Sequence, residues 1–157
     1  MGSSKRILLI EDNKHDQFFF KQALNEIDSA TLFFVANNGK EALDKLSSSD
    51  VLPDLIFTDI HMPVMDGIEY LSETVKLPLI KDIPVVVLSS DPTRMEAIRD
   101  LGVRVFIEKP ANCDILQKLL EYVLTMQFMT TENAAECLGF QFIRSDSNMA
   151  IHPRVYR

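Results

Sequence analysis

Short aliphatic runs alternate with amphipathic segments along most of this chain, and this alternation limits the folds open to it. Residues 14–27 and 113–126 have the apolar spacing of helices that cover a core on one side. The aliphatic runs are typical of strands buried on both faces, and they lie at 5–10, 31–36, 54–58, 83–88 and 103–107. Strands that alternate with helices through short loops form a parallel sheet covered on both faces. The predicted fold class is therefore α/β, a doubly wound five-stranded parallel sheet.

The composition is that of an ordinary globular chain of about one domain. Of 157 residues, 46% are hydrophobic and 25% are charged, which excludes a disordered, collagenous or coiled-coil protein. Acidic residues outnumber basic ones by 23 to 16, so the protein repels nucleic acids and anionic membranes. Because the sequence has neither an apolar run of roughly 18 residues nor a signal-peptide pattern, we expect a cytoplasmic protein that binds neither DNA nor membrane.

Polar side chains follow directly after four of the predicted strands. In doubly wound sheets ligands bind at the carboxyl ends of the strands, so residues at these positions should share one rim. They are Glu11 and Asp12 after the first strand, Asp59 after the third, Ser89 after the fourth and Lys109 after the fifth. Three carboxylates, one hydroxyl and one ammonium are thus predicted to converge.

The three carboxylates at this rim require a cation. Carboxylates about 4 Å apart repel each other by roughly 4 kcal/mol per pair at an effective dielectric of about 20. Hard oxygen ligands without histidine or cysteine favour Mg²⁺, held here by Glu11 and Asp12. Lys109 and Ser89 fit a tetrahedral anion beside the metal. A carboxylate can attack phosphorus, and Asp59, between the two pairs, is the predicted nucleophile for phosphoryl transfer.

Four motifs at these strand ends resemble the response-regulator receiver domain of two-component signalling, also called CheY-like, across about residues 5–126. They are the acidic pair Glu11-Asp12, the run DIHMPVMDG at 59–67, Ser89 followed by Ser90, and the dipeptide Lys109-Pro110. The resemblance implies a flavodoxin-like fold with strand order 2-1-3-4-5. It also implies that Asp59 accepts a phosphoryl group from a sensor histidine kinase or a histidine phosphotransfer protein.

The resemblance also assigns a ligand set and two tuning positions. It implies Mg²⁺ bound by Asp12, Asp59 and the backbone carbonyl of His61, with Glu11 contributing mainly through water. His61 and Asp91 lie two residues past Asp59 and Ser89, respectively. These positions are expected to tune hydrolysis of the acyl phosphate.

A second group of positions matches the family's switch. Ser89 and Lys109 would bind the phosphoryl group, and Phe106 would be the aromatic residue that turns inward when Ser89 moves. The family often has tyrosine at that position, and a plain core aromatic is the alternative interpretation of Phe106. The family commonly has a cis peptide bond before the proline that matches Pro110.

We expect three segments: a leader at 1–4, a receiver domain at 5–126 and a C-terminal extension at 127–157. In the extension, a short helix is predicted at 131–138 and an edge strand at 140–144. The extension is too short for the DNA-binding output domains common in this family, so the chain is expected to signal to a downstream protein by contact. A homodimer would form through the extension or through the face of the fourth helix, fifth strand and fifth helix.

Three alternatives differ from this switch. A phosphorelay carrier would pass the phosphoryl group on to a second histidine, and the sequence does not separate it from a switch. A magnesium-dependent phosphatase with an aspartyl nucleophile, as in the haloacid dehalogenase family, needs a second aspartate two residues after the first, where His61 stands. A module that only binds partners would not need the complete acidic, Ser and Lys set. We therefore expect a phosphoacceptor that catalyses only its own phosphorylation and dephosphorylation, not an enzyme.

Overall fold

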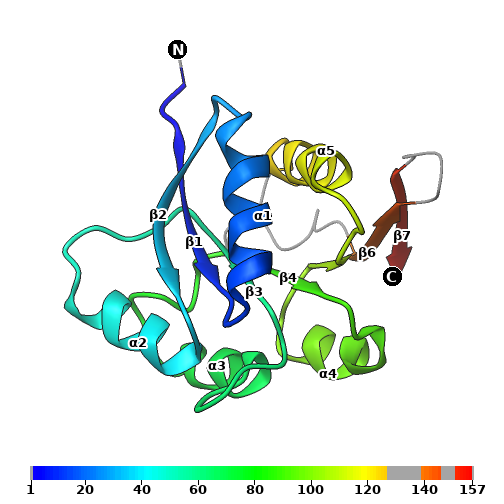
Figure 1. The fold of residues 1–157 in the computed structure, drawn as a ribbon. Coiled ribbons are helices and arrows are strands. Elements are labelled where there is room, and N and C mark those ends of the chain that lie inside the picture. Colours follow the sequence, from blue (N-terminus) through cyan, green and yellow to red (C-terminus); the bar gives the residue numbers. More distant parts are fainter. Residues whose placement is uncertain (1, 127–138, 146–150, 157) are drawn as a thin grey trace.

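The sheet contains the five strands predicted for the receiver domain and two strands from the C-terminal extension. The computed structural model describes residues 2–126, 139–145 and 151–156, and the strands in these ranges form one sheet of order β2-β1-β3-β4-β5-β6-β7 (Figure 1). β1 to β6 are parallel, and β7 is antiparallel to β6. The fold class and the order 2-1-3-4-5 are confirmed. The strands are Lys5–Ile10 (β1), Ala30–Ala36 (β2), Leu55–Thr58 (β3), Val85–Ser89 (β4), Val105–Glu108 (β5), Phe140–Ser145 (β6) and Ile151–Tyr156 (β7).

Helices cover both faces of the sheet. α1 and α5 pack on one face, and α2, α3 and α4 pack on the other (Figure 1). Side chains of Asn13, Asn38, Asp66 and Asn112 accept backbone hydrogen bonds from the first turns of α1, α2, α3 and α5. The helices are Lys14–Asn25 (α1), Gly39–Ser48 (α2), Gly67–Thr74 (α3), Met95–Asp100 (α4, after the 3₁₀ turn Pro92–Arg94) and Cys113–Leu124 (α5).

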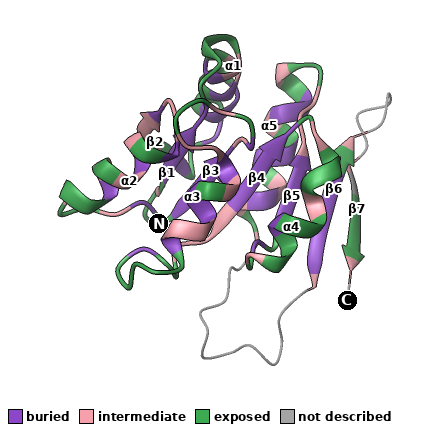
Figure 2. Cartoon of the chain, turned by 90° about the horizontal axis from the view of Figure 1, so that it is seen from below, coloured by how far each residue is buried: buried purple, intermediate pink, exposed green. Residues whose placement is uncertain are grey.

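β1 shows why its aliphatic run is unbroken. Ile7 and Leu9 belong to the core under α1 and α5, whereas Leu8 and Ile10 belong to the core under α2, α3 and α4. Because side chains alternate across a strand, a strand covered on both faces needs apolar residues at every position. Figure 2 shows the result, with buried residues filling the central strands β3, β4 and β5 and most of β1, and exposed residues on the outer sides of the helices.

The C-terminal part of the chain extends the sheet beyond β5. β6 lies parallel to β5, with Phe142 opposite Phe106, and the rings of these two residues are 5.6 Å apart between centroids. The predicted strand at 140–144 is therefore present, but it is not an edge strand, because β7 pairs with its other side. The helix predicted at 131–138 lies outside the described residues.

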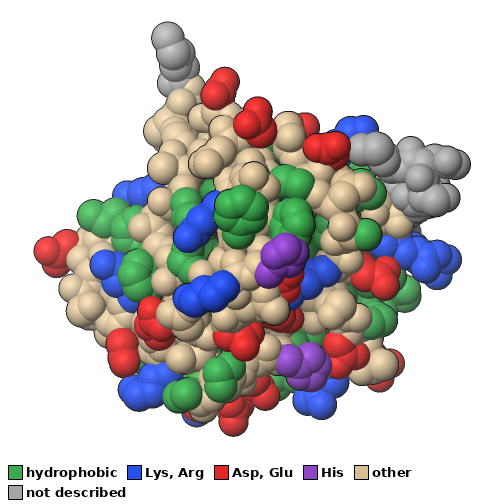
Figure 3. Space-filling view, in the orientation of Figure 1, with side chains coloured by type: hydrophobic (Ala, Val, Ile, Leu, Met, Phe, Trp, Pro, Cys, Tyr) green, Lys and Arg blue, Asp and Glu red, His purple; other side chains and the backbone are tan. Residues whose placement is uncertain are grey.

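The surface agrees with the acidic composition. On the face seen in Figure 3, Lys and Arg side chains are interspersed with Asp and Glu and do not merge into one basic patch among the described residues. Within the same residues, none of the helices has both the length and the apolar character needed to cross a bilayer.

Candidate functional site at the carboxyl edge of the sheet

The parallel strands bring the predicted residues to one edge of the sheet. Glu11 and Asp12 follow β1, Asp59 follows β3, and Lys109 follows β5, while Ser89 is the last residue of β4. β1 and β4 both pair with β3, so the acidic pair and the serine flank the strand that Asp59 follows. Neighbouring parallel strands end at the same rim, which is why residues far apart in the sequence meet there.

Three carboxylates form a tight cluster at this edge. One oxygen from each of Glu11, Asp12 and Asp59 lies within 4.8 Å of the others. Glu11 is buried, Asp59 is partly buried and Asp12 is exposed, so the cluster opens toward solvent on the Asp12 side. An all-oxygen donor set of this kind suits Mg²⁺, which prefers carboxylates and keeps several waters. The chemistry of the residues therefore fits the expected metal.

Lys109 places its ammonium against this cluster. Its Nζ lies 2.8 Å from Glu11 Oε2, from Asp59 Oδ2 and from Asp16 Oδ2. Burial alone would lower the pKa of Lys109, but the hydrogen bonds to Asp16, Asp59 and Glu11 outweigh it and raise the pKa above its usual value. The ammonium is therefore a fixed positive charge at neutral pH. Asp16, in the first turn of α1, is a member of the site that the sequence analysis missed.

Glu11 is the most buried carboxylate of the site. Burial raises the pKa of its carboxyl to about 7, and the hydrogen bond and charge of Lys109 reduce this rise. Its Oε1 also accepts the backbone N–H of Asn13 at 3.0 Å. A carboxyl held in this way exchanges protons near neutral pH, and a bound cation would favour its charged form.

Asp59 is held at both carboxylate oxygens. Oδ1 accepts the backbone N–H of Ile60 at 2.6 Å, and Oδ2 accepts from Lys109. The loop after Asp59 packs against its backbone through Gly67, where a Cβ would lie 2.2 Å from the Asp59 carbonyl oxygen. Glycine is therefore required at the end of the 59–67 motif, because any side chain would push the loop away from Asp59.

Ser89 and Phe106 are both fully buried. Ser89 is 1% exposed, and its hydroxyl oxygen accepts the backbone N–H of Asp91 at 3.2 Å. Phe106 is 0% exposed and packs on the α2–α4 face against Phe142. The ring of Phe106 is thus already in an inward position in this structure.

The expected cis bond before Pro110 is absent. The described residues contain no cis peptide bond, so Lys109 and Pro110 are joined in trans and the cis prediction is wrong here. The trans form is the favoured one for an X-Pro bond, by about 0.5 to 1 kcal/mol. The Lys109 ammonium reaches Asp59 with this bond in trans.

His61 and Asp91 form a bridge between two loops of the site. His61 Nε2 lies 2.7 Å from Asp91 Oδ2, joining the loop after β3 to the loop after β4. Hydrogen bonds from Thr93, with the contact to His61, lower the pKa of Asp91 to about 2. Asp91 therefore stays ionised at any physiological pH.

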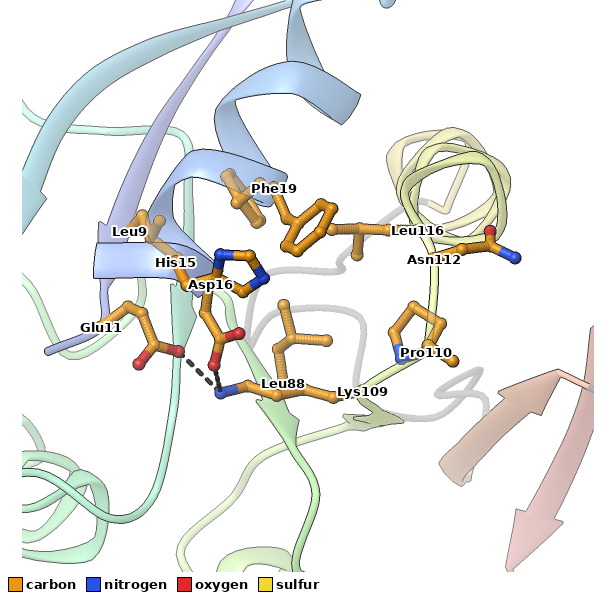
Figure 4. A pocket seen from close by; sticks show the side chains of 12 residues that line it. Leu9, Glu11, His15, Asp16, Phe19, Leu88, Lys109, Pro110, Asn112 and Leu116 are labelled. Atoms are coloured by element: carbon orange, nitrogen blue, oxygen red, sulfur yellow. Dashed lines mark hydrogen bonds and ion pairs between the residues drawn. The ribbon is translucent and has the colours of Figure 1, made fainter. Parts of the chain in front are cut away.

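A cavity of about 220 Å³ adjoins the site from the side of α1 and α5. Its walls include Phe19, Phe20 and Leu116, and Glu11, Asp16 and Lys109 supply its charged part (Figure 4). The Lys109 ammonium is thus bordered by a cavity whose other walls are mostly apolar.

This geometry is that of a receiver domain, and sequence comparison agrees. A family model described as response regulator receiver domain matches residues 7–121. The chain therefore belongs to the response regulator receiver family of two-component signalling.

Relatives carry this domain alone or within larger proteins. The two-component response regulator ORR42 of Oryza sativa subsp. japonica is 32% identical over 120 residues, which cover 76% of this chain and 87% of that protein. The sensor histidine kinase CheAY of Helicobacter pylori is 29% identical over 123 residues, which cover 77% of this chain but 15% of that protein. The crystal structure of the phosphorylated cyanobacterial phytochrome response regulator RcpA matches with a TM-score of 0.70 and 33% identity, covering 77% of this chain and 91% of that one.

Proposed function

We propose that Asp59 accepts a phosphoryl group from a phosphohistidine of a sensor kinase or of a phosphotransfer protein. The observation that carries this proposal is the position of its carboxylate, 2.8 Å from the Lys109 ammonium and within 4.8 Å of the Glu11 and Asp12 oxygens. In the transfer, a bond forms between an Asp59 oxygen and phosphorus as the phosphorus–nitrogen bond of the donor breaks. The electron pair of that bond goes to the imidazole nitrogen of the donor.

Asp12, Asp59 and the backbone carbonyl of His61 would hold Mg²⁺, with Glu11 contributing through water. Bound Mg²⁺ would neutralise charge on the phosphoryl oxygens. Lys109 supplies a second positive charge beside Asp59, because three carboxylates hold its ammonium there. Phosphoryl transfer needs alignment and charge neutralisation more than it needs acid or base groups. The chain thus acts on itself and turns over no separate substrate.

Ser89 and Phe106 are the proposed switch. The hydroxyl of Ser89 would turn to donate to a phosphoryl oxygen, giving up its contact with the Asp91 backbone. Movement of Ser89 would change the space open to Phe106, whose ring also packs on Phe142 of β6. We therefore place the surface that signals to a downstream protein, or to a second copy of the chain, over α4, β5, α5 and the β6–β7 hairpin.

The His61–Asp91 bridge is proposed to set the lifetime of the acyl phosphate. It joins the loop after β3, which begins with Asp59, to the loop after β4, whose last residue is Ser89. A bridge across these loops restricts the approach of water to a phosphoryl group on Asp59. Hydrolysis should then be slower with the bridge than without it.

The test is intact mass spectrometry after treatment with acetyl phosphate and Mg²⁺. Wild type should gain the mass of one phosphoryl group, Asp59→Asn should gain none, and EDTA should prevent the gain. Asp54→Asn is the matched control, because Asp54 lies at the other end of β3 and pairs with Arg6. Wild type that stays unmodified, or Asp59→Asn that is modified, contradicts the proposal. Transfer of the phosphoryl group from the phosphorylated protein to an added histidine phosphotransfer domain would identify a relay carrier.

A further inference from the structure

Asp16 takes part in the site without belonging to the acidic cluster that fits a metal. It lies in the first turn of α1, and its Oδ2 is 2.8 Å from the Lys109 ammonium. We propose that Asp16 is a positioning residue that holds Lys109 and limits how strongly the ammonium binds the phosphoryl group. This inference rests on the proposed phosphorylation of Asp59.

The ammonium of Lys109 has no hydrogen to spare. It carries three N–H donors, and three carboxylates lie at hydrogen-bond distance, from Glu11, Asp16 and Asp59. An incoming phosphoryl oxygen must therefore replace one of these acceptors. The affinity of Lys109 for the phosphoryl group is therefore higher when the acceptor that it releases is the one that costs least to release.

Exposure identifies Asp16 as the acceptor to be released. Its side chain is 37% exposed, compared with 4% for Glu11 and 12% for Asp59. A buried carboxylate that loses its partner is left without hydration, whereas an exposed one is taken up by water. Release of Asp16 therefore costs less than release of Glu11, and Asp59 is the phosphoryl acceptor itself.

The start of α1 aims Asp16 at Lys109. The side chain of Asn13 accepts the backbone N–H groups of His15 and Asp16, which fixes the first turn. Figure 4 shows the Asp16 carboxylate pointing from α1 to the Lys109 ammonium, beside Glu11. An acidic residue in a first turn ordinarily stabilises the helix through its dipole, and that role alone would affect stability without changing ion binding.

Asp16→Asn should shift the binding of cations and anions in opposite directions. It removes one negative charge beside the ammonium, so beryllofluoride at saturating Mg²⁺ should bind roughly three- to tenfold more tightly and Mg²⁺ alone should bind more weakly by a similar factor. A role confined to helix stability would change neither affinity of the folded protein, and a general disruption of the site would weaken both. Isothermal titration of the full chain measures both affinities.

Lysine labelling tests the contact itself without phosphoryl chemistry. In metal-free protein, an amine-reactive reagent followed by peptide mass spectrometry should modify Lys109 several-fold faster in Asp16→Asn than in wild type. Asp16→Glu keeps the charge and should restore wild-type labelling and affinities. Glu26→Gln is the matched control, because it removes one charge from the exposed far end of α1.

The outcomes separate a failure of this inference from a failure of the proposed function. Faster labelling together with opposite shifts in affinity supports the inference. Unchanged labelling overturns it, and so do affinities that both weaken or both stay the same. If wild type binds no beryllofluoride, the proposed function fails and this inference fails with it. If wild type binds it normally and Asp16→Asn behaves in the same way, only the role of Asp16 is lost.

Discussion

Phe142→Ala tests whether the β6–β7 hairpin is an integral part of the core. Phe142 is 8% exposed, and its ring lies 5.6 Å from the ring of Phe106 on the neighbouring strand. The substitution removes this ring and leaves a cavity beside Phe106, which is itself 0% exposed. It therefore weakens the contact that joins the extension to the rest of the sheet.

The expected loss follows from the burial of the ring. Truncating a core phenylalanine to alanine costs about 3 to 5 kcal/mol, of which the aromatic pair supplies about 1 kcal/mol. Phe142 lies one strand from the edge, where β7 can shift to fill part of the cavity, so we expect about 3 kcal/mol. That is a large share of the roughly 5 to 15 kcal/mol that stabilises a domain.

Two measurements separate a global effect from a local one. Urea unfolding gives the change in total stability, and amide hydrogen exchange compares protection in β6 with protection in β1 and β3. We expect a lower urea midpoint and the greatest loss of protection in β6. Val155→Ala is the control, because Val155 is 51% exposed and should cost less than about 0.5 kcal/mol. An unchanged midpoint with unchanged protection in β6 would refute the assigned packing.

Three further predictions concern the site. Gly67→Ala forces a Cβ to 2.2 Å from the Asp59 carbonyl oxygen. The substitution should lower the stability measured in thermal melts by more than about 1 kcal/mol and slow phosphorylation. A variant with wild-type stability and phosphorylation rate would exclude this close packing. Because burial raises the pKa of Glu11 from 4.5 to about 7, its protonated form favours the folded state, and this advantage is lost as pH rises from 4.5 to 7. In thermal melts of the metal-free protein, the stability of Glu11→Gln relative to wild type should increase as pH rises over that range. A stability difference between the two proteins that does not change with pH would contradict the raised pKa of Glu11. His61→Ala removes the 2.7 Å contact with Asp91. It should shorten the acyl-phosphate lifetime by less than about tenfold and leave the unfolding midpoint unchanged. A lifetime equal to that of wild type would show that the bridge does not control hydrolysis.

The central sheet and most of the site could be predicted because they depend on local patterns. Unbroken aliphatic runs such as 5–10 identify strands, and parallel strands fix which residues share a rim. Glu11, Asp59 and Lys109 follow their strands directly, so no knowledge of side-chain conformation was needed to bring them together. The order and direction of the strands are enough to place these three residues at one rim.

Other features depend on contacts that no local pattern contains. Asp16 meets Lys109 across 93 positions of sequence, and the contact requires a particular tilt of α1 and a particular Lys109 conformation. The position of Asp16 in the sequence still gives a partial indication, because the first turn of a helix that follows a strand begins at the same rim as the end of that strand. In β7, Pro153 argues against a strand, since proline lacks the N–H of a sheet ladder and is confined to edges. β7 lies at the edge of the sheet formed by the described residues, a position that tolerates proline.

The charges of the site determine the order in which ligands can bind. Glu11, Asp12, Asp16 and Asp59 carry four negative charges when ionised, and Lys109 carries one positive charge, which leaves an excess of three. A phosphoryl group on Asp59 adds about one more negative charge. Without a cation, the donor would therefore approach a site that repels it at short range, whereas a divalent cation removes two of the three excess charges. We therefore expect metal binding to precede phosphoryl transfer, and the rate of phosphorylation to rise with Mg²⁺ until the cluster is saturated.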